Sequence, residues 1–534
     1  MRLSRPFFIS FAVLGAFTLA AQFQSHRAAA QFSAGPVVGG KLPDLPAPPS
    51  LGGKKTVIVA PQPLSKPTPI WKPTPRPTPT PAPLWKPRFL GQKTIRVGLS
   101  TAGESIQIYF PGGATLWNDK TFFSTIPAGT TAILSSQPDK SIVIGLAGQR
   151  KMGFQRAYFA VSGDPARVTT NGKSPRYGRP YRGDLEIFPQ KLPEPVKRKG
   201  PLALVNVVPL EAYLKGVVPW EMAPTAPLEA LKAQAICART KTLDFVQSGR
   251  FKAGDFEVCD YDACQGYPGT ENEKPTTSAA VEQTRGLAIY QNGRPIDAVY
   301  STNSGGITAN ARDVWKGTTP INYLQSVPDF PANSPLAQLW EGGMTEGEWA
   351  QFCAQDWPSY ARPDGVSSTK YEARKYRWSE FISVEAATKA FAAEDGISGI
   401  TNIQVMERSP SGRIRRLRVT GFSQAVQPSN QTSDGWPPAA QNLMGVEKTI
   451  DFEGDGKIRS MFSKRLGSTT ALPSSLFTIS PVTDANGAPT GWNFQGAGWG
   501  HGVGMCQRGA QNHAREGWNA RRILNHYYRG VEIR

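Results

Sequence analysis

VNVVPLEAYLKGVVPWEMAPTAPLEALKAQAICARTKTLDF, residues 205–245, is the stretch that decides the fold of this 534-residue chain. It begins as an apolar, β-branched run typical of a buried strand and continues into a long helical pattern. Glu221 lies between the two, shortly after Pro219. The proline ring fixes φ of Pro219 at about −65° and pushes Val218 toward extended geometry. We therefore expect few backbone conformations before Glu221, so that its carboxyl group is aimed in one direction.

Glu221 is the candidate catalytic residue of this stretch. Trp220 and Met222 flank it with apolar surface, which would raise the pKa of a buried carboxylic acid and keep it protonated as a proton donor. The alternative is a surface glutamate in a turn before a helix, which is common because negative charge is favourable near a helix N-terminus. The local residues leave both interpretations open.

A helix is predicted next, over residues 228–246. Pro227 suits the first helical position, and Gly249 follows the last turn. Residues at helical spacing would form its buried face: Leu228, Leu231, Ala235, Ala238, Thr242 and Phe245. Lys232 and Arg239 are spaced so that both lie on one side of the helix. They are either a solvated face or two cations that hold a ligand.

The remaining patterns indicate an α+β fold. Strands are predicted over 94–110, 141–146, 183–188, 202–208, 403–408 and 414–420, and further helices over 345–354, 384–393 and 520–528. They are interspersed without regular βα alternation. We expect one domain over residues 93–534, with two lobes and a groove. Residues 421–444, rich in Gln, Asn, Ser and Pro, read as an inserted loop.

The N-terminal part has a different composition. Residues 1–30 read as an export signal with a charged start, an apolar stretch and a small-residue cleavage site. Residues 31–92 form a basic, Pro-rich linker, whose prolines favour a stiff, extended and disordered spacer. The alternative is a tether in which Trp71 and Trp85 stack on a ligand while Lys and Arg side chains contact anionic polymer. Membrane association would come only through an uncleaved signal segment.

Charge narrows the class of partner. The formal net charge is +19, and the basic linker contributes much of it. In an exported protein, such charge suits anionic wall polymers or lipid head groups better than nucleic acid. The sequence contains no nucleic-acid module, phosphate loop or heptad run, so we expect no nucleic-acid partner.

Six motifs together carry a family resemblance. They read LEAYLKGVVPWEM, PLEALKAQAICART, NSGGITANARDVW, YLQSVPD, GWGHGVGMCQRGA (residues 498–510) and ILNHYYRGVEI (residues 523–533). In this order they resemble the stage II sporulation protein D (SpoIID) family, which also includes the amidase enhancer LytB. The resemblance spans roughly residues 95–534.

The resemblance implies an exported bacterial protein that acts on peptidoglycan. The sporulation proteins are lytic transglycosylases whose essential acid is the Glu of the Pro-x-Glu-Met motif, here Glu221. Lys232 and Arg239 look like basic residues that these enzymes use, which implies substrate or transition-state contacts. The resemblance further implies glycan strands stripped of stem peptides as substrate. Glu211 and Glu229 are interpreted as structural.

The glycine-rich motif supplies further candidate binding residues. Its glycines let the backbone turn tightly and approach a ligand. A sugar could stack on Trp499 while His501 donates a hydrogen bond, or His501 could tie the loop to the core. Gln507 is a candidate polar contact. His513 and His526 are expected to cap or pack helices.

Metals and cofactors are not expected. Some family members bind zinc where Cys259 and Cys264 lie, but Ala263 stands here in place of their His. A disulfide, two free thiols and a zinc site are the three interpretations, and the disulfide is favoured for an exported chain. DFEGDGKIRSMF resembles a calcium loop, but Phe462 replaces the bidentate Glu. A tight acidic turn before a strand is predicted instead.

The sequence therefore predicts an enzyme of the periplasm or cell wall that cleaves the glycan strands of peptidoglycan between N-acetylmuramic acid and N-acetylglucosamine. A single glutamate, Glu221, would serve as acid and base to give 1,6-anhydro products. The main alternative is a non-enzymatic, LytB-like protein that binds peptidoglycan and enhances an amidase. A basic wall tether with a vestigial catalytic domain is a third interpretation.

Overall fold

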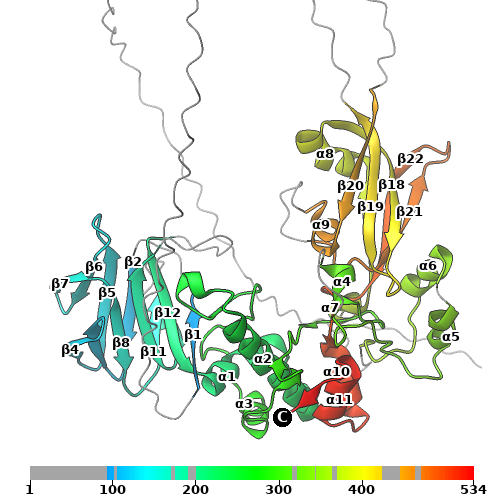
Figure 1. Ribbon diagram of the computed structural model, residues 1–534. Coiled ribbons are helices and arrows are strands. Elements are labelled where there is room, and N and C mark those ends of the chain that lie inside the picture. The colour runs from blue at the N-terminus through cyan, green and yellow to red at the C-terminus, as the bar shows by residue number, and fades with distance from the viewer. Residues whose placement is uncertain are drawn as a thin grey trace, which may run out of the picture. The chain divides into compact units, whose positions relative to one another are not determined.

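The structure, a computed structural model, describes residues 93–100, 105–169, 175–190, 200–315, 321–342, 344–363, 370–423, 445–463 and 471–534 (Figure 1). The predicted signal (1–30), the linker (31–92, with Trp71 and Trp85) and most of the predicted loop (421–444) lie outside these residues. Within the described ranges, no helix has the length and apolar character needed to cross a membrane.

Two antiparallel sheets begin the described chain. The first has the order β13-β1-β12-β11-β8-β3-β4. Its strands are β1 (Thr94–Gly98), β3 (Ala114–Asn118), β4 (Thr121–Ile126), β8 (Ala157–Val161), β11 (Asp184–Pro189), β12 (Leu202–Pro209) and β13 (Val258–Cys259). Strand β13 is the exception to the antiparallel arrangement, because it runs parallel to β1. The second has the order β10-β9-β2-β5-β6-β7, with β2 (Ser105–Phe110), β5 (Thr130–Ser136), β6 (Ile142–Leu146), β7 (Gln149–Phe154), β9 (Ala166–Thr169) and β10 (Arg179–Tyr181).

Their burial follows from their sequences. Strand β2 alternates between half-buried and buried residues, as expected when one face of a sheet packs on a core. In β12 every residue from Leu202 to Val208 is buried, including the polar Asn206. Phe110 of β2 stacks on Phe159 of β8 with ring centroids 5.1 Å apart, so the two sheets share one core.

Helices follow β12 directly and extend that core. They are α1 (Leu210–Glu221), α2 (Leu228–Ser248) and α3 (Pro275–Gln283), joined from the C-terminal end by α10 (Gln507–Arg515) and α11 (Ala520–Tyr527). Helix α2 contacts the other four (Figure 1). Gly249 ends α2 in the left-handed conformation (φ 63°), as predicted. Short 3₁₀ turns lie at Pro175–Tyr177 and Lys252–Gly254.

Two small sheets lie beside these helices and join distant segments. One contains β14 (Ile289–Gln291), β15 (Arg294–Pro295) and β24 (Glu532–Ile533). The other pairs β16 (Tyr300–Ser301) with β23 (Met505–Cys506) in parallel. The second pairing brings the segment around Tyr300 next to the glycine-rich motif.

A second hydrophobic core lies in the later part of the chain. One of its sheets consists of β17 (Arg377–Ser383), β21 (Phe477–Thr483) and β22 (Pro489–Ala497). The other consists of β18 (Ile397–Arg408), β19 (Ile414–Ser423) and β20 (Glu447–Glu453). Helices α8 (Val384–Asp395) and α9 (Asp455–Ser460) belong to the same core. A smaller cluster involves α5 (Pro335–Gly342) and α6 (Glu346–Ala354). Helices α4 (Ala311–Val314) and α7 (Lys370–Tyr376) are short connectors.

The α+β prediction is confirmed, and the described residues contain two large hydrophobic cores; the two lobes and the groove between them stay predictions. Three local predictions are wrong. Residues 421–423 belong to strand β19 and not to a loop. The DFEGDGKIRSMF segment ends a strand and forms helix α9, because Ile458 packs into the second core. Leu228 is 42% exposed, although the other residues of its predicted apolar face are buried.

Candidate active site

Glu221 is the last residue of α1. The helix packs into the core through Leu210, Tyr213, Leu214, Gly216, Val217 and Val218. This packing keeps the segment helical even though Pro219 lies inside it and cannot donate a helical hydrogen bond. The predicted extended approach to Glu221 is therefore wrong. The helix stops because Met222 is extended (φ −135°, ψ 134°) and because Pro224 disfavours helical geometry at Ala223.

A loop after β13 supplies the hydrogen bond that orients the Glu221 side chain. Gly266 N donates to Glu221 Oε1 at 2.9 Å. A side chain at this position would not fit, since a Cβ on Gly266 would lie 2.0 Å from Trp220 Cδ1. The loop is fixed by Gln265, whose Oε1 accepts a 3.0 Å hydrogen bond from Tyr300 OH. The carboxyl group is thus held between the end of α1 and a restrained loop.

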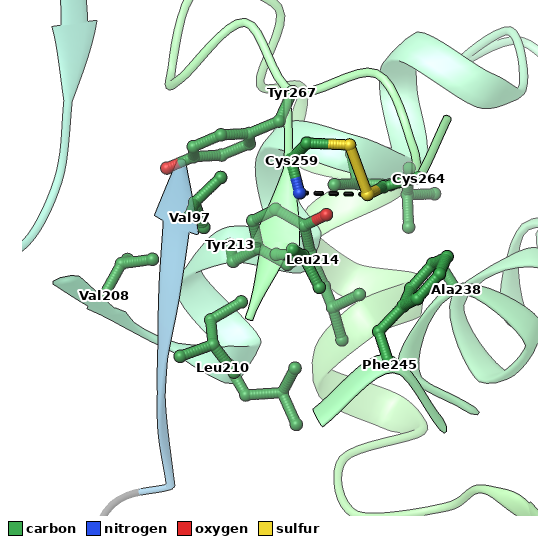
Figure 2. Packing of buried hydrophobic residues seen from close by; sticks show 14 of the residues in the cluster. Val97, Val208, Leu210, Tyr213, Leu214, Ala238, Phe245, Cys259, Cys264 and Tyr267 are labelled. Carbon is green, nitrogen blue, oxygen red and sulfur yellow. Dashed lines mark hydrogen bonds between the residues drawn. A yellow bond between two sulfur atoms is a disulfide. The ribbon is translucent and has the colours of Figure 1, made fainter. Parts of the chain in front are cut away.

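Cys259 and Cys264 form a disulfide in this loop, with Cα atoms 5.6 Å apart (Figure 2). The structure confirms the disulfide interpretation over free thiols or a zinc site. The cross-link lies beside the packed rings of Tyr213 and Tyr267, whose centroids are 4.7 Å apart. It closes the chain two residues before Gly266. The other described cysteines are buried free thiols: Cys237, Cys353 and Cys506.

The environment of Glu221 favours its protonated form. Burial raises its pKa from 4.5 to about 7; the Gly266 N–H opposes this shift, and the charge of Asp262 adds to it. The C-terminal end of a helix acts in the same direction, because its negative dipole disfavours a carboxylate. Burial also raises the pKa values of the neighbouring phenols Tyr213 and Tyr300, which stay neutral. Glu221 is therefore about half protonated near neutral pH.

A pocket of about 610 Å³ opens on one side of Glu221. An aromatic wall is formed by Tyr300 and Trp315, and His501 lies against Trp315 with ring centroids 5.2 Å apart. The charged lining consists of Lys241, Arg250, Asp262 and Asp297 besides Glu221. Lys241 and Asp297 form an ion pair. This side of the site combines aromatic surface with charges of both signs.

His501 enters this pocket as a neutral hydrogen-bond donor. Its Nδ1 accepts a 3.0 Å hydrogen bond from Val503 N, so the neutral ring carries its proton on Nε2. Burial lowers the pKa of His501 to about 4. The surrounding loop turns through glycines with positive φ: Gly498, Gly500, Gly502 and Gly504. His501 thus ties the loop to itself through Nδ1 and lines the pocket, while its hydrogen bond to a sugar stays a prediction.

Glu221 also lines a second pocket, of about 520 Å³. Its charged lining apart from Glu221 is basic: Lys375, Arg508 and Arg515. Trp220, which is 56% exposed, lies at this pocket. Gln507 also lines it, and its Nε2 donates to the backbone oxygen of Glu221 at 2.8 Å. Gln507 therefore positions Glu221, a contact that the sequence did not predict.

Arg239 is not available to a substrate. Its side chain is 1% exposed and forms a double hydrogen bond to Glu211, at 2.9 Å and 2.6 Å. Further donors reach the carbonyl oxygens of Leu287 and Val281. The predicted substrate contact is therefore wrong for Arg239, which ties α1 and α2 to the chain around α3. The structural interpretation of Glu211 is confirmed.

Lys232 and Trp499 also lie outside the two pockets. Lys232 Nζ bonds Glu229 Oε1 at 2.7 Å, one turn away on α2. Glu229 Oε2 also accepts from Ala520 N, which agrees with its structural interpretation. Trp499 is half-buried and pairs through its backbone with Asn303 in both directions. Neither Lys232 nor Trp499 lines a pocket at Glu221, so these predicted substrate contacts find no support in the geometry.

Sequence reasoning missed the residues that the tertiary fold brings to the site. Tyr300 reaches it through the pairing of β16 with β23, and Lys375 comes from α7. No local pattern marks either residue. The burial of Arg239 did have a signal: it follows Ala235 by four positions and precedes Thr242 by three, so it lies on the predicted buried face.

Two family models match the chain. The model described as stage II sporulation protein, SpoIID, matches residues 198–290, which include α1, Glu221 and the disulfide loop. A domain of unknown function, DUF8618, matches residues 309–432 and 441–504. The first match covers the segment that carries Glu221 and Gly266.

Curated relatives extend the similarity along the chain. An uncharacterized protein of Brachyspira hyodysenteriae is 26% identical over 446 residues, covering 83% of this chain and 94% of the relative. The amidase enhancer of Bacillus subtilis is 29% identical over 320 residues, covering 60% of this chain and 40% of that protein. Stage II sporulation protein D of the same organism is 27% identical over 356 residues, covering 64% and 78%.

Proposed function

Because the chain belongs to the SpoIID and LytB family, whose members act on the bacterial cell wall, we propose that it is an exported lytic transglycosylase that cleaves peptidoglycan glycan strands. The observation that carries the proposal is the state of Glu221. This carboxyl group is partly buried at the end of α1, has a pKa raised to about 7 and borders two pockets. A group with such a pKa can give and take a proton near neutral pH.

The hydrogen bond from Gly266 assigns roles to the two carboxyl oxygens. Glu221 Oε1 accepts from the Gly266 N–H, so in the acid form it is the carbonyl oxygen and Oε2 carries the proton. Oε2 would protonate the glycosidic oxygen as the bond to the muramic anomeric carbon breaks. The resulting carboxylate then takes the proton of the muramic 6-hydroxyl, whose oxygen closes the 1,6-anhydro ring. The scheme uses no cofactor and no enzymic nucleophile, unlike the two-carboxylate glycosidases.

The two pockets that Glu221 lines provide room for sugars next to its carboxyl group. Trp315 and Tyr300 offer stacking surface in one pocket, and the exposed Trp220 offers it in the other. Neutral His501 can donate from Nε2 to a sugar oxygen without competing for the proton of Glu221. Gln507 holds the backbone of Glu221 and acts as a positioning residue. Strands without stem peptides are the proposed substrate.

Product analysis tests the proposal. Purified full-length protein is incubated with denuded glycan strands, and the products are examined by mass spectrometry. We expect 1,6-anhydromuramic ends from the wild type and none from Glu221→Gln. Glu229→Gln is the matched control: it removes a carboxylate eight positions along the chain that borders neither pocket, and it should keep the activity. Hydrolytic ends, or product formation by the Glu221→Gln variant, would refute the assignment.

The amidase-enhancer relative supports a second candidate function. It is 29% identical, but the aligned region covers only 40% of that protein. In this alternative the chain binds glycan strands, cleaves none, and raises the activity of a separate cell-wall amidase. Adding the full-length protein to an amidase assay on intact sacculi distinguishes the two functions. Faster peptide release without anhydro products would favour the enhancer.

A further inference from the structure

Three side chains with metal-binding atoms meet at the C-terminal helices. Asp329 follows the YLQSVP segment, His513 lies on α10 and His526 lies on α11, and one ligand atom of each lies within 4.8 Å of the others. The side chains of Asp329 and His513 are 0% exposed, and that of His526 is 22% exposed. In the described part of the chain, no other group of His, Cys, Asp and Glu residues has this arrangement.

The distances in this cluster suit a bridging cation. His513 Nε2 lies 3.3 Å from Asp329 Oδ1, and His526 Nε2 lies 3.8 Å from the same oxygen. The first contact is a hydrogen bond longer than the usual N–H···O separation of about 2.9–3.0 Å, and the second is too long for a hydrogen bond. Two ligands bound to zinc at about 2.0–2.1 Å in a tetrahedron lie about 3.3–3.4 Å apart. The first pair already has this spacing, and the second needs only a small approach. The ligand atoms of the two histidines lie within 4.8 Å of each other and would also have to approach on binding.

The cluster also contains a polar atom without a hydrogen-bond partner. His526 Nε2 is buried and forms no hydrogen bond in the structure. Buried polar groups normally have a partner, and an orphan indicates a missing water or ion. Since His526 Nε2 lies near the Asp329 carboxyl group, a cation between them would satisfy the nitrogen and neutralise buried negative charge.

The surroundings hold the ligands in place. Tyr527 OH donates to Asp329 Oδ1 at 2.9 Å, and Ser304 Oγ donates to Oδ2 at 3.1 Å. Hydrogen bonds of this kind orient carboxylate ligands in metal sites. The ring of His513 packs against Tyr360 and Trp518, with centroids 3.9 Å and 4.0 Å away. The ligand positions are thus preorganised by residues that do not themselves bind.

We infer that Asp329, His513 and His526 form a structural site for a divalent transition metal, best matched by Zn²⁺. Two imidazoles and one carboxylate are a zinc ligand set with three protein ligands, which leaves the fourth position to a water molecule. Calcium and magnesium prefer oxygen ligands alone. The site is separate from Cys259 and Cys264, whose sulfur atoms form a disulfide.

Such a site would join α10, α11 and the segment of Asp329 at one point. Helix α10 begins at Gln507, which holds the backbone oxygen of Glu221. The metal would therefore stabilise the helix that positions Glu221 without lining either pocket. This role is independent of the reaction catalysed and of the choice between enzyme and enhancer.

Metal binding to the full-length protein tests the inference. The protein is treated with chelator, supplied with ZnCl₂ or CoCl₂ and passed through a desalting column. We expect about one Zn²⁺ per chain by elemental analysis and a higher melting temperature. Co²⁺ should give the visible absorption of a tetrahedral complex. His526→Gln and His513→Gln should each weaken binding by at least about 100-fold, and Tyr527→Phe by about 10-fold.

His501→Gln is the matched control, because it makes the same replacement outside the cluster and should keep the metal. A wild-type protein that retains no zinc would overturn the inference. So would zinc that stays bound in both His513→Gln and His526→Gln. If those variants fail to fold, X-ray absorption of the zinc-loaded wild type decides: nitrogen and oxygen ligands alone support the site, and a sulfur ligand refutes it.

Discussion

Replacing Glu221 with Gln should stabilise the folded protein at neutral and alkaline pH while it removes catalysis. Gln has the same shape, and its Oε1 can still accept the hydrogen bond from Gly266 N. It cannot ionise, so it avoids the free energy of placing a negative charge in a partly buried site at the C-terminal end of α1. Stability and activity should therefore change in opposite directions.

The size of the effect follows from the pKa of Glu221. That pKa rises from 4.5 to about 7 on folding, and each pH unit corresponds to about 1.36 kcal/mol. The folded chain keeps its proton at pH values where the unfolded chain has lost it. The stabilising contribution of the protonated Glu221 is therefore fully present below about pH 4.5, and it is lost as the pH rises through about 7. The wild type should lose up to about 3 kcal/mol in free energy of unfolding over this range.

Urea unfolding at several pH values measures the difference. Glu221→Gln should match the wild type near about pH 4.5 and exceed it by up to about 3 kcal/mol near pH 8. Glu229→Gln is a control for which the opposite change in stability is expected. Burial raises the pKa of Glu229, but its hydrogen bonds from Lys232 and Ala520 outweigh burial, so that its pKa is lowered. Removing this carboxylate should therefore destabilise the folded protein at pH 8. If Glu221→Gln is no more stable than the wild type at pH 8, the carboxyl group is not desolvated as argued.

Other changes should act on activity, stability or location separately. The kcat/KM on glycan strands should fall about tenfold per pH unit above about pH 7, because the acid form of Glu221 is consumed; a flat profile from pH 6 to pH 9 would contradict this. Arg239→Ala should lower the free energy of unfolding by about 3–5 kcal/mol, because it leaves Glu211 without its buried partner, and it should not change the reaction product. An unchanged melting temperature in a calorimetric scan would contradict the structural role of Arg239. Gln507→Ala should lower turnover by up to about 100-fold through misplacement of Glu221, measured as anhydro product per minute, and unchanged turnover would exclude a positioning role. Deleting residues 41–88 should leave activity on short soluble glycans intact but reduce retention on sacculi at low salt, with the difference vanishing at about 0.5 M salt; equal retention would mean that the spacer provides only reach.

The sequence predicted the elements with strong periodicity and missed the features that depend on partners distant along the chain. Helix α2 was predicted almost to its ends because Pro227 and Gly249 bound an uninterrupted pattern. Helix α1 was not predicted, since a proline near its end argues against a helix and only tertiary packing overrides that preference.

The same limit applies to the site. Glu221 stood out because Pro219, Trp220 and Met222 surround it in sequence, and it does border both pockets. Arg239 was misread because its partner, Glu211, lies on another helix. The cluster of Asp329 with His513 and His526 was not predicted, because no metal-ligand spacing links its residues, which come from three separate segments.

The short disulfide loop makes the oxidation history of a preparation an experimental variable. A cross-link over so few residues is worth about 2 kcal/mol in chain entropy, and it closes the loop whose Gly266 orients Glu221. A reducing cytoplasm keeps cysteines as thiols, so material harvested from that compartment carries a looser loop around its key carboxyl group. Two laboratories that use different expression compartments would then obtain different specific activities from one amino-acid sequence.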